Sequence, residues 1–474
     1  MFVKRRSYGW VVTEFNDNHN HPLVPKWSLT RYLRSHKNIP EDEVDFLRLL
    51  HSCNLETSRQ MQIMGSLYGS IDHMTYGPKE VANLRASFRR EDRYTDMQGT
   101  LEYFMQLKQE DKDFFCKFLM DEENRVECMF WIDGPSRRAY KFYNDCLSFD
   151  TTYCTNIYKM PCAPFIGINC HGQSIQFGCG FLRNELTDSF IWLFETFLEA
   201  MDGLAPLNII TDQDFAMRAG IDKVFPHARH RNCRLHIVRK AQEVIGPLMS
   251  RNLELNEDFK DCLNDSLTPQ EFEAKWLAMI QRHGVEGNTD LAALYEKRNC
   301  WVPAYFMHNF YPFLQTTGRS EGFNAVLKKY VNPQNSVSDF VRQYAAIQEK
   351  YHNAEGKEEA DTLITTATTW CSHPIEVQME KIYTRSIYYR FQSEMQKLMS
   401  YNCQHIMGDI YSTVCIAKFV PHYGDRSYTV HANVGAEHYE CECSKMDRDG
   451  MVCCHILKVQ NKKDFKSSLP YFVN

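Results

Sequence analysis

The sequence predicts an α/β fold for the centre of the chain, and two observations carry that prediction. Between residues 114 and 240, short apolar runs are separated by turns, as expected for strands, and they cover 126–132, 145–150, 165–170, 175–182 and 207–211. A stretch with helical spacing, 189–201, lies between the last two runs. Three adjacent strands followed by a helix and a further strand are typical of a mixed sheet of the α/β class.

The chain is too long for one compact core. Its 474 residues, at roughly 100 to 200 residues per domain, predict two to four units. A hydrophobic fraction of 43% indicates globular packing, and a net charge of -6 excludes a surface that is basic overall. Binding to nucleic acid must therefore rely on local basic patches, of which the sequence offers one at 1–37 and one at 229–240.

Five segments follow one another along the chain. Residues 1–36 contain a strand-like run, 8–15, followed by a polar turn. Residues 37–113 have apolar positions at helical spacing and form a predicted helical linker region. The α/β core spans 114–345 and carries a helical insertion at about 241–313. Residues 346–410 are predicted to be helical, and 411–474 contain strand-like runs at 414–420 and 428–434 that lead into a cysteine cluster.

The sequence gives no sign of a membrane segment. No apolar stretch reaches the roughly 18 residues that would span a membrane, and the N-terminus lacks the apolar region of a secretory signal. We expect a soluble, intracellular protein with no membrane partner. In a reducing compartment most of the 18 cysteines are expected to be buried thiols or metal ligands.

Three acidic residues lie where a phosphodiester-cutting core would need them. Asp150 and Asp212 each end a strand-like run, and Glu321 opens a helix-like stretch after 316–320. Carboxylates at strand ends and on a neighbouring helix can hold a pair of Mg²⁺ or Mn²⁺ ions about 4 Å apart, an arrangement that drives in-line attack on phosphodiesters. The alternative for either Asp alone is a loop residue or a helix cap, and Asp214 suits a cap better than a metal ligand.

Cys233 and His236 form a second motif, three positions apart within the basic stretch. Two ligands do not complete a tetrahedral zinc site, so the residues alone favour a buried thiol and a hydrogen-bonded imidazole. The basic side chains around them are candidates for contacts to DNA phosphates. They are Arg229, Arg231, Arg234, Arg239 and Lys240.

The strongest local motif is the pattern C-x-C, nine residues, C-x-H, formed by Cys441, Cys443, Cys453 and His455. Three soft thiolates and one imidazole in two close pairs suit a closed, structural zinc site. Cys454 and His438 are spare candidates for the same ion. At the other end of the chain, His19 and His21 could form half of a further zinc site, although no thiol pair precedes them; the alternative is a solvated polar turn.

These motifs occur together with family-typical segments at 149–153, 160–165, 210–214, 224–226 and 319–321. In combination they resemble the plant far-red-impaired-response family, transcription regulators descended from Mutator-like element transposases. The resemblance covers nearly the whole chain. It implies a central transposase core of the ribonuclease H-like fold, an N-terminal zinc finger of the WRKY/GCM type that binds DNA, and a C-terminal SWIM zinc finger.

Carried over by match, the resemblance assigns roles to the residues above. Asp150, Asp212 and Glu321 correspond to the ancestral catalytic acids, and Cys233 and His236 to the signature between the second and third acids. The SWIM ligands are Cys441, Cys443, Cys453 and His455. His19 and His21 correspond to the histidine half of the N-terminal finger, whose cysteine half is absent from this sequence. We therefore expect 1–36 to be a partial finger, left by truncation or by loss of the site.

The function that follows is a nuclear, zinc-binding, transposase-derived regulator of transcription, linked to light-controlled development. We expect DNA as a partner and oligomers with itself or with related family members. Retention of all three acids leaves an active Mutator-like transposase as the alternative, so enzymatic activity stays open, with a domesticated, non-catalytic core preferred. A third hypothesis is a protein-interaction module that recruits a DNA-binding relative.

Overall fold

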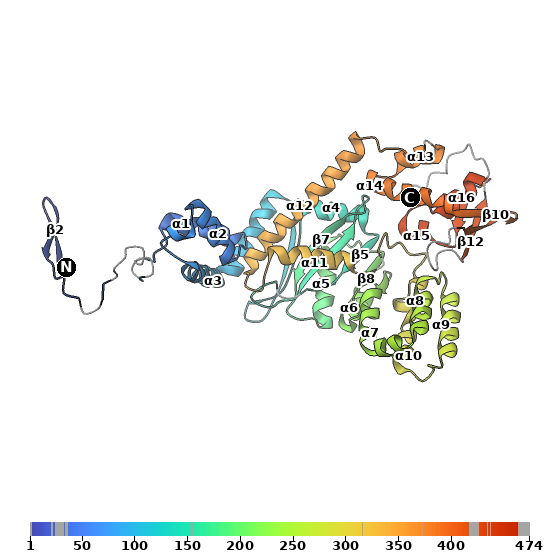
Figure 1. Cartoon of the computed structure of the whole chain (residues 1–474), viewed down its shortest axis with the longest axis horizontal. Coiled ribbons are helices and arrows are strands. Elements are labelled where there is room, and N and C mark those ends of the chain that lie inside the picture. Colours follow the sequence, from blue (N-terminus) through green and yellow to red (C-terminus); the bar gives the residue numbers. More distant parts are fainter. Residues whose placement is uncertain are drawn as a thin grey trace. The chain divides into compact units, whose positions relative to one another are not determined.

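The computed structural model describes residues 2–19, 22–23, 33, 37–152, 155–314, 316–371, 373–416, 426–433, 435–436 and 438–462. The chain divides into two compact units, Met1–Asp96 and Met97–Asn474 (Figure 1). Among helices of the described ranges, none has the length and apolar character that crossing a membrane requires.

The first unit contains a hairpin and a small helical cluster. Strands β1 (Phe2–Arg6) and β2 (Gly9–Glu14) pair antiparallel, and Gly9 at the start of β2 has φ +131°, a backbone conformation that glycine adopts without strain. Helices α1 (Glu41–Ser52) and α2 (Thr57–Leu67), a 3₁₀ turn (Ile71–His73) and the start of α3 (Pro78–Glu110) follow. Leu47, Met64 and Val81 lie in their common core. These helices lie within the segment 37–113, whose description as a linker region stays a prediction.

The second unit is built on a seven-stranded mixed sheet with the order β3-β4-β7-β6-β5-β8-β9. The strands are β3 (Phe115–Met120), β4 (Val126–Ile132), β5 (Cys146–Phe149), β6 (Cys162–Ile168), β7 (Ser174–Phe181), β8 (Asn208–Thr211) and β9 (Arg229–Asn232). Neighbours from β3 to β5 pair antiparallel, whereas β5, β8 and β9 are parallel. The predicted α/β class is confirmed, and β4, β5, β6, β7 and β8 coincide with the five predicted runs to within a few residues. Strands β3 and β9 were not predicted.

Helices cover both faces of this sheet (Figure 1). On one face, α4 (Gly134–Tyr143), α5 (Thr187–Ala200) and α6 (Phe215–Val224) share a core with the strands. Helix α5 buries Phe190, Phe194 and Phe197, which recur at helical spacing, and the ring of Phe197 stacks on Phe165 of β6 at 4.3 Å between centroids. Fully burying one such side chain stabilises the fold by roughly 1.5–3 kcal/mol. The predicted helix at 189–201 agrees with α5.

The opposite face packs against the end of α3, α11 (Gly318–Tyr330) and α12 (Val337–Ile364). Phe323 of α11 and Phe340 and Tyr344 of α12 are buried there against Trp131 of β4 and Phe181 of β7. This packing holds α11, which carries Glu321, over the sheet.

The helical insertion separates α11 from the strands that precede it. It consists of α7 (Arg234–Arg251), α8 (Leu253–Asn264), α9 (Pro269–His283), α10 (Thr289–Glu296) and the 3₁₀ turns Arg298–Cys300 and Pro303–Tyr305. These helices bury a core of their own around Phe272, Trp276 and Trp301. Asn252 and Thr268 cap the first turns of α8 and α9 with their side chains. Helix α7 starts at Arg234, earlier than the predicted insertion at about 241.

The C-terminal region combines helices with a small antiparallel sheet. Helices α13 (Pro374–Ile382) and α14 (Arg385–Lys397) and a 3₁₀ turn (Leu398–Ser400) precede β10 (Tyr401–Met407), β11 (Ile410–Cys415), β12 (Ser427–Asn433) and β13 (His438–Cys441). The short helix α15 (Lys445–Asp449) and α16 (Cys454–Lys462) follow. Strand β10 lies inside the segment 346–410 that was predicted to be helical. This prediction is wrong at 401–407, where a mostly exposed edge strand lacks an apolar pattern.

Candidate metal centres

The acidic site begins at the ends of two parallel strands. Strands β5 and β8 are hydrogen-bonded neighbours with Phe149 opposite Thr211. Asp150 and Asp212 are the next residues of each strand, so both leave the same edge of the sheet side by side. Asp214 caps α6 instead, because its Oδ1 accepts the Met217 N–H at 2.7 Å, as the sequence predicted.

Glu321 reaches this edge from the first turn of α11. The helix is fixed to β5 by a buried hydrogen bond of 2.6 Å between the hydroxyls of Ser148 and Ser320. One turn further along α11, the side-chain amide of Asn324 donates to Asp150 Oδ2 at 3.4 Å. The helix therefore contacts the sheet directly beside Asp150.

His236 and Thr317 join the second and third acids. Nδ1 of His236 lies 2.5 Å from Asp212 Oδ1, and its Nε2 lies 3.3 Å from Glu321 Oε1. The hydroxyl of Thr317 lies 3.2 Å from the same Asp212 oxygen and 3.4 Å from the same Glu321 oxygen. A single imidazole and a single hydroxyl thus each span both carboxylates.

The electrostatics of the site favour a cation. The pKa of Asp150 is raised to about 7, chiefly by burial and then by the charges of Asp212 and Glu321, with a smaller contribution from Glu185. The Thr151 backbone N–H opposes this shift. Glu185 also accepts a hydrogen bond from the Thr151 hydroxyl. Several carboxylates that repel one another at the edge of a sheet are the ligand type that Mg²⁺ and Mn²⁺ prefer. The structure brings together the three acids that the sequence singled out.

Cys233 contacts two residues next to the acids, Thr211 and Thr317. Its backbone N–H donates to Thr211 O at 2.7 Å, and its buried sulfur accepts the Thr317 N–H at 3.3 Å. Helix α7 begins directly after Cys233, which places His236 on the first turn. The donor atoms of Asp212, Cys233 and His236 lie within 4.8 Å of one another. Spacing alone favoured a packed thiol and a partnered imidazole, and the structure adds that both belong to the acidic site.

Sequence reasoning missed Thr317 and Asn324. They lie four residues before and three residues after Glu321, so all three occupy one face of α11. The sequence contains this spacing, but it does not show which face of α11 lies against β5. The structure supplies that information.

A separate cluster of thiols lies in the C-terminal region. Cys441 ends β13, Cys443 lies in the turn after it, Cys453 precedes α16, and His455 is on its first turn. Their four donor atoms lie within 4.8 Å of one another, and Cys441 Sγ is 3.5 Å from His455 Nδ1. Gly450, with φ +66°, ends α15 and turns the chain back toward the cluster.

The surroundings of this thiol cluster fit a zinc ion. His455 is buried, and its Nδ1 faces the sulfur of Cys441. The imidazole stacks on Tyr428 at 3.9 Å between ring centroids, and Tyr401 contacts it edge-on at 4.7 Å. Three thiols and one imidazole are the donor set of a closed tetrahedral site. The two spare candidates, His438 and Cys454, are not among the four residues whose donor atoms meet. His438 is exposed and lies 3.5 Å from Glu440, and the backbone N–H of Cys454 donates to Glu394.

The remaining predicted residues have mixed placements. Arg229, Arg239 and Lys240 are exposed and Arg234 is half-buried. The expectation for Arg231 needs correction, because it is 2% exposed, lies over the rings of Phe306 and Tyr311, and cannot reach a DNA phosphate. Packing of these two rings against β9 covers the side chain. His19 lies in the irregular segment after β2, and His21 lies outside the described residues.

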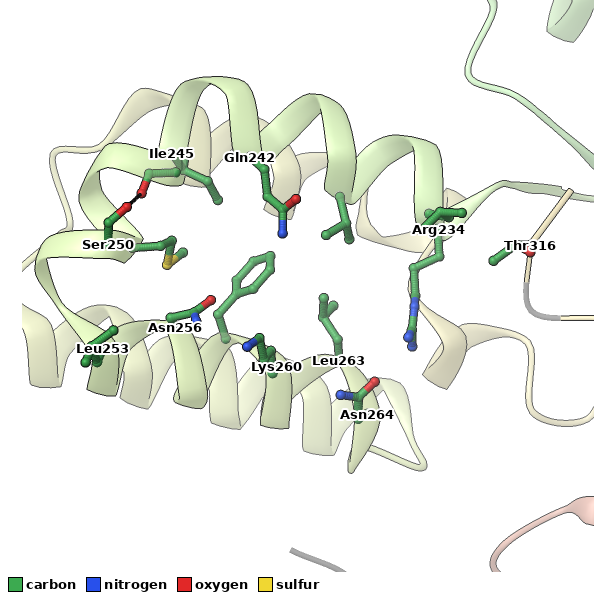
Figure 2. Close-up of a pocket in the computed structure, with 15 residues that line it drawn as sticks. Arg234, Gln242, Ile245, Ser250, Leu253, Asn256, Lys260, Leu263, Asn264 and Thr316 are labelled. Carbon is green, nitrogen blue, oxygen red and sulfur yellow. Dashed lines mark hydrogen bonds between the residues drawn. The ribbon is translucent and has the colours of Figure 1, made fainter. Parts of the chain in front are cut away.

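A groove of about 430 Å³ lies between α7 and α8 (Figure 2). Ile245, Met249 and Phe259 give it a largely apolar lining. Arg234 and Thr316 lie at one end of it, and Ser250 and Leu253 lie at the other (Figure 2). The groove contains none of the three acids, although its Arg234 end is two residues from His236.

The fold and the acidic site define a class of protein. Residues 146–240 match the family described as the MULE transposase domain. This segment runs from β5 into α7 and contains Asp150, Asp212, Cys233 and His236. The chain therefore carries a Mutator-like transposase domain.

Similarity to particular proteins extends beyond that domain. Protein FAR1-RELATED SEQUENCE 5 of Arabidopsis thaliana is 32% identical over 476 residues, which cover 99% of this chain and 60% of that protein. Protein FAR-RED IMPAIRED RESPONSE 1 of the same plant is 30% identical over 483 residues, covering 100% of this chain and 57% of that protein. The chain thus spans a little under two thirds of the length of these relatives. Its resemblance to the far-red-impaired-response family is confirmed.

Proposed function

We propose that this chain is a zinc-binding regulator of transcription, derived from a transposase, that acts on DNA in the nucleus as part of a light response. One observation carries the proposal. Nearly the whole of this chain is similar to part of FAR-RED IMPAIRED RESPONSE 1 and of its related sequences, and the same chain has both a transposase domain and a separate thiol cluster. The far-red response belongs to the name of this relative, and it is extended to this chain as a proposal.

We infer that the core is ribonuclease H-like. In favour of this, the strands β7, β6 and β5 are antiparallel, and β8 and β9 add to β5 in parallel. Helix α5 connects β7 to β8, and α6 connects β8 to β9. Two of the acids leave the central strand and its parallel neighbour, where metal-dependent nucleases of this architecture need them.

Zinc at the thiol cluster would hold the C-terminal region together. Cys453 is packed in the same core as Phe391 of α14, Val430 of β12 and Leu457 of α16. An ion shared by β13 and α16 would therefore tie the small sheet to its helix, as closed sites of this donor type do. This proposal corresponds to the SWIM finger expected from the family resemblance.

DNA contacts are proposed for the basic side chains near the acidic site. A cavity of about 290 Å³ between the insertion and the thiol cluster is lined by Arg234, Lys397, Lys445 and Arg448. Lys397 and Lys445 pair with Glu394, and Arg448 pairs with Asp449. Burial lowers the pKa of Arg234, a sign that its charge is costly without an anion. A phosphate beside Arg234, with Arg239 and Lys240 on the same helix, would position DNA without reading its sequence.

The regulatory proposal is tested in plant cells. The full chain is fused to a fluorescent protein and expressed with light-responsive promoter reporters, and location and reporter output are measured in far-red light and in darkness. We expect nuclear fluorescence and a promoter-dependent change that Cys453→Ser abolishes and Cys454→Ala preserves. A nuclear protein that leaves every reporter unchanged, or a Cys453→Ser variant as active as the parent, would argue against this function. Co-purification of a related full-length family member would support the proposed oligomers.

An active transposase is the second candidate, because the three acids converge and burial and mutual repulsion raise the pKa of Asp150. Two divalent ions bound there would supply an activated water or 3′ hydroxyl and a stabilised leaving oxygen. Asp150, Asp212 and Glu321 would hold the ions, and His236 would fix the orientation of the last two carboxylates.

Strand cleavage on DNA carrying terminal inverted repeats decides between the two functions. In Mn²⁺, an enzyme would cut, Asp150→Asn would remove the activity, and Asp214→Asn would retain it because that residue only caps α6. Absence of cleavage by the parent protein, or equal cleavage by Asp150→Asn, leaves the regulatory function standing alone.

A further inference from the structure

A third group of metal-ligating side chains lies away from both sites described above. Cys170 and His171 occupy the turn between β6 and β7, and Glu359 faces them from α12. One donor atom from each lies within 4.8 Å of the others, and Nε2 of His171 is 3.1 Å from Glu359 Oε2. We propose that these residues bind a zinc-type divalent ion that fastens this turn to α12.

The turn that carries the first two ligands is held rigidly. Asn169 Oδ1 accepts backbone N–H groups from His171 at 3.1 Å and from Gln173 at 2.9 Å. Gly172 has φ +72°, which closes the turn. The carbonyl of Cys170 accepts the Thr384 hydroxyl at 2.8 Å. Because the backbone is fixed by these contacts, Cys170 and His171 are held next to each other before any ion binds.

His171 presents a buried imidazole to this group. Its side chain is 1% exposed, and Nε2 is the ring nitrogen that faces Glu359 at 3.1 Å. An imidazole nitrogen is a common zinc ligand, so Nε2 is the ligand atom of the proposed site.

The charges around the turn also favour a cation. Glu355 is one helical turn before Glu359 on α12, and its Oε1 accepts the Asn169 side-chain amide at 3.0 Å. Packing around the sulfur raises the pKa of the Cys170 thiol, and Glu359 and Glu355 raise it as well, although the Tyr143 hydroxyl, 3.2 Å away, opposes them. A thiolate, an imidazole and a carboxylate suit zinc or cobalt better than magnesium. Glu355 or a water would occupy the fourth position.

The required movement is small. With zinc bonds of about 2.0–2.3 Å, tetrahedral ligand atoms are separated by roughly 3.3–3.8 Å. The His171–Glu359 pair is already at 3.1 Å, and the largest separation in the group is 4.8 Å or less. A side-chain rotation of Cys170, which is exposed at the surface, can close that gap.

The fastened turn also reaches the acidic site. Arg319, two residues before Glu321 on α11, donates to the carbonyl of Gly172 at 2.8 Å and lies 3.4 Å from the Ser174 hydroxyl. An ion at Cys170 would therefore order the turn that supports the start of α11. This is a structural role, and it is independent of whether the acids cut DNA.

The test follows Cys170 itself in the full chain. Protein stripped of metal is reloaded with zinc at the thiol cluster, then treated with iodoacetamide with and without additional zinc, and alkylation of each cysteine is followed by mass spectrometry. We expect additional zinc to slow the modification of Cys170 by about tenfold or more, since a zinc-bound thiolate is shielded. Cys53, which is exposed in the other unit, serves as an internal control and should react at an unchanged rate.

Two variants make the result specific. Glu359→Gln should remove the protection of Cys170, whereas Glu349→Gln, an exposed glutamate on the same helix, should keep it. Cobalt titration of metal-free protein should show about one equivalent fewer for Cys170→Ser than for Cys53→Ser, with a weaker thiolate-to-cobalt absorption. Both comparisons use variants whose unfolding curves match the parent. Unprotected Cys170 in the parent protein, or equal protection in Glu359→Gln, overturns the proposal.

Discussion

The acidic site and the thiol cluster collect their ligands over very different lengths of chain. The thiol cluster uses residues between Cys441 and His455, brought together by one short helix and one glycine turn. The acidic site takes Asp150 from the end of β5, Asp212 from the end of β8, His236 from the first helix of the insertion and Glu321 from α11, which follows the insertion. The first site needs only local structure, whereas the second exists only when the whole sheet and α11 have assembled.

The two sites also differ in what they do without metal. The thiol cluster is packed inside a hydrophobic core, so an ion bound there would contribute directly to folding. The acidic site is partly open, and its carboxylates repel one another while an imidazole and a hydroxyl bridge two of them. A closed site holds structure and an open one can exchange ligands. The following experiments test whether this contrast holds.

Loss of zinc from the thiol cluster should have the largest effect. We expect Cys453→Ser to lower the free energy of unfolding of the C-terminal region by on the order of 5 kcal/mol, because binding of structural zinc contributes directly to the free energy of folding. Zinc content by elemental analysis and urea unfolding measure this. The adjacent Cys454→Ala should retain the ion, since Cys454 lies outside the cluster. Equal zinc content in the two variants would show that the cluster is not the site.

Neutralising Asp150 should stabilise the protein when no divalent ion is added to the acidic site. The folded-state pKa of Asp150 is about 7, above the ordinary value near 4, so the folded state binds the proton more tightly than the unfolded state. Stability is therefore lost as the pH rises from about 4 to about 7. We expect Asp150→Asn to gain roughly 2–4 kcal/mol at pH 8, with a smaller gain at pH 5, in denaturant titrations of zinc-loaded protein.

With added Mn²⁺ the parent should become more stable than Asp150→Asn. The Asp150 carboxylate binds the ion, whereas the Asn amide of the variant binds it poorly. A gain from Asp150→Asn that did not vary with pH would contradict the proposed repulsion. Asp214→Asn is the control, and its stability should stay close to that of the parent at both pH values, because the Asn side-chain oxygen can accept the Met217 N–H as Asp214 does.

Removing the bridge at His236 should have a moderate effect. His236→Ala breaks contacts to both Asp212 and Glu321, and we expect a loss of about 1–3 kcal/mol together with weaker Mn²⁺ binding. Unfolding curves and Mn²⁺ titration measure the two effects. His227→Ala, an exposed histidine between α6 and β9, should change neither. If only stability falls and Mn²⁺ affinity is unchanged, His236 packs beside the metal site without organising it.

The smallest effect is expected at a single DNA contact. Arg234→Gln should weaken DNA binding a few-fold and reduce the slope of log affinity against log salt by about 0.9, the value for one lost phosphate contact. Arg251→Gln, an exposed arginine at the far end of α7, should alter the slope less. Fluorescence anisotropy over a range of salt concentrations measures both. Equal slopes for the two variants would remove Arg234 from the DNA surface.

Much of the acidic site could be read from the sequence, because apolar runs that end in Asp indicate strand ends. Strand β9 could not, since its residues Arg229–Asn232 are all polar and its pairing with β8 depends on the sheet being present. The burial of Arg231 could not be predicted either, because it depends on β9 pairing with β8 and on the rings that cover it. Cys170 and Glu359 meet only after α12 packs across the sheet, and no sequence spacing connects them. Thr317 and Asn324 share a face with Glu321, but the sequence does not show that this face of α11 lies against β5.

Helix α7 connects the acidic site to the rest of the helical insertion. Its first turn carries His236, and its later turns, from Val238 to Met249, line one wall of the groove in Figure 2. An uninterrupted helix is stiff along its axis, so a shift of the turns of α7 that precede Pro247 also moves the imidazole at its near end. Substitutions in α8 that widen or narrow the groove can therefore adjust the spacing of Asp212 and Glu321 from a distance, without altering any residue that contacts them.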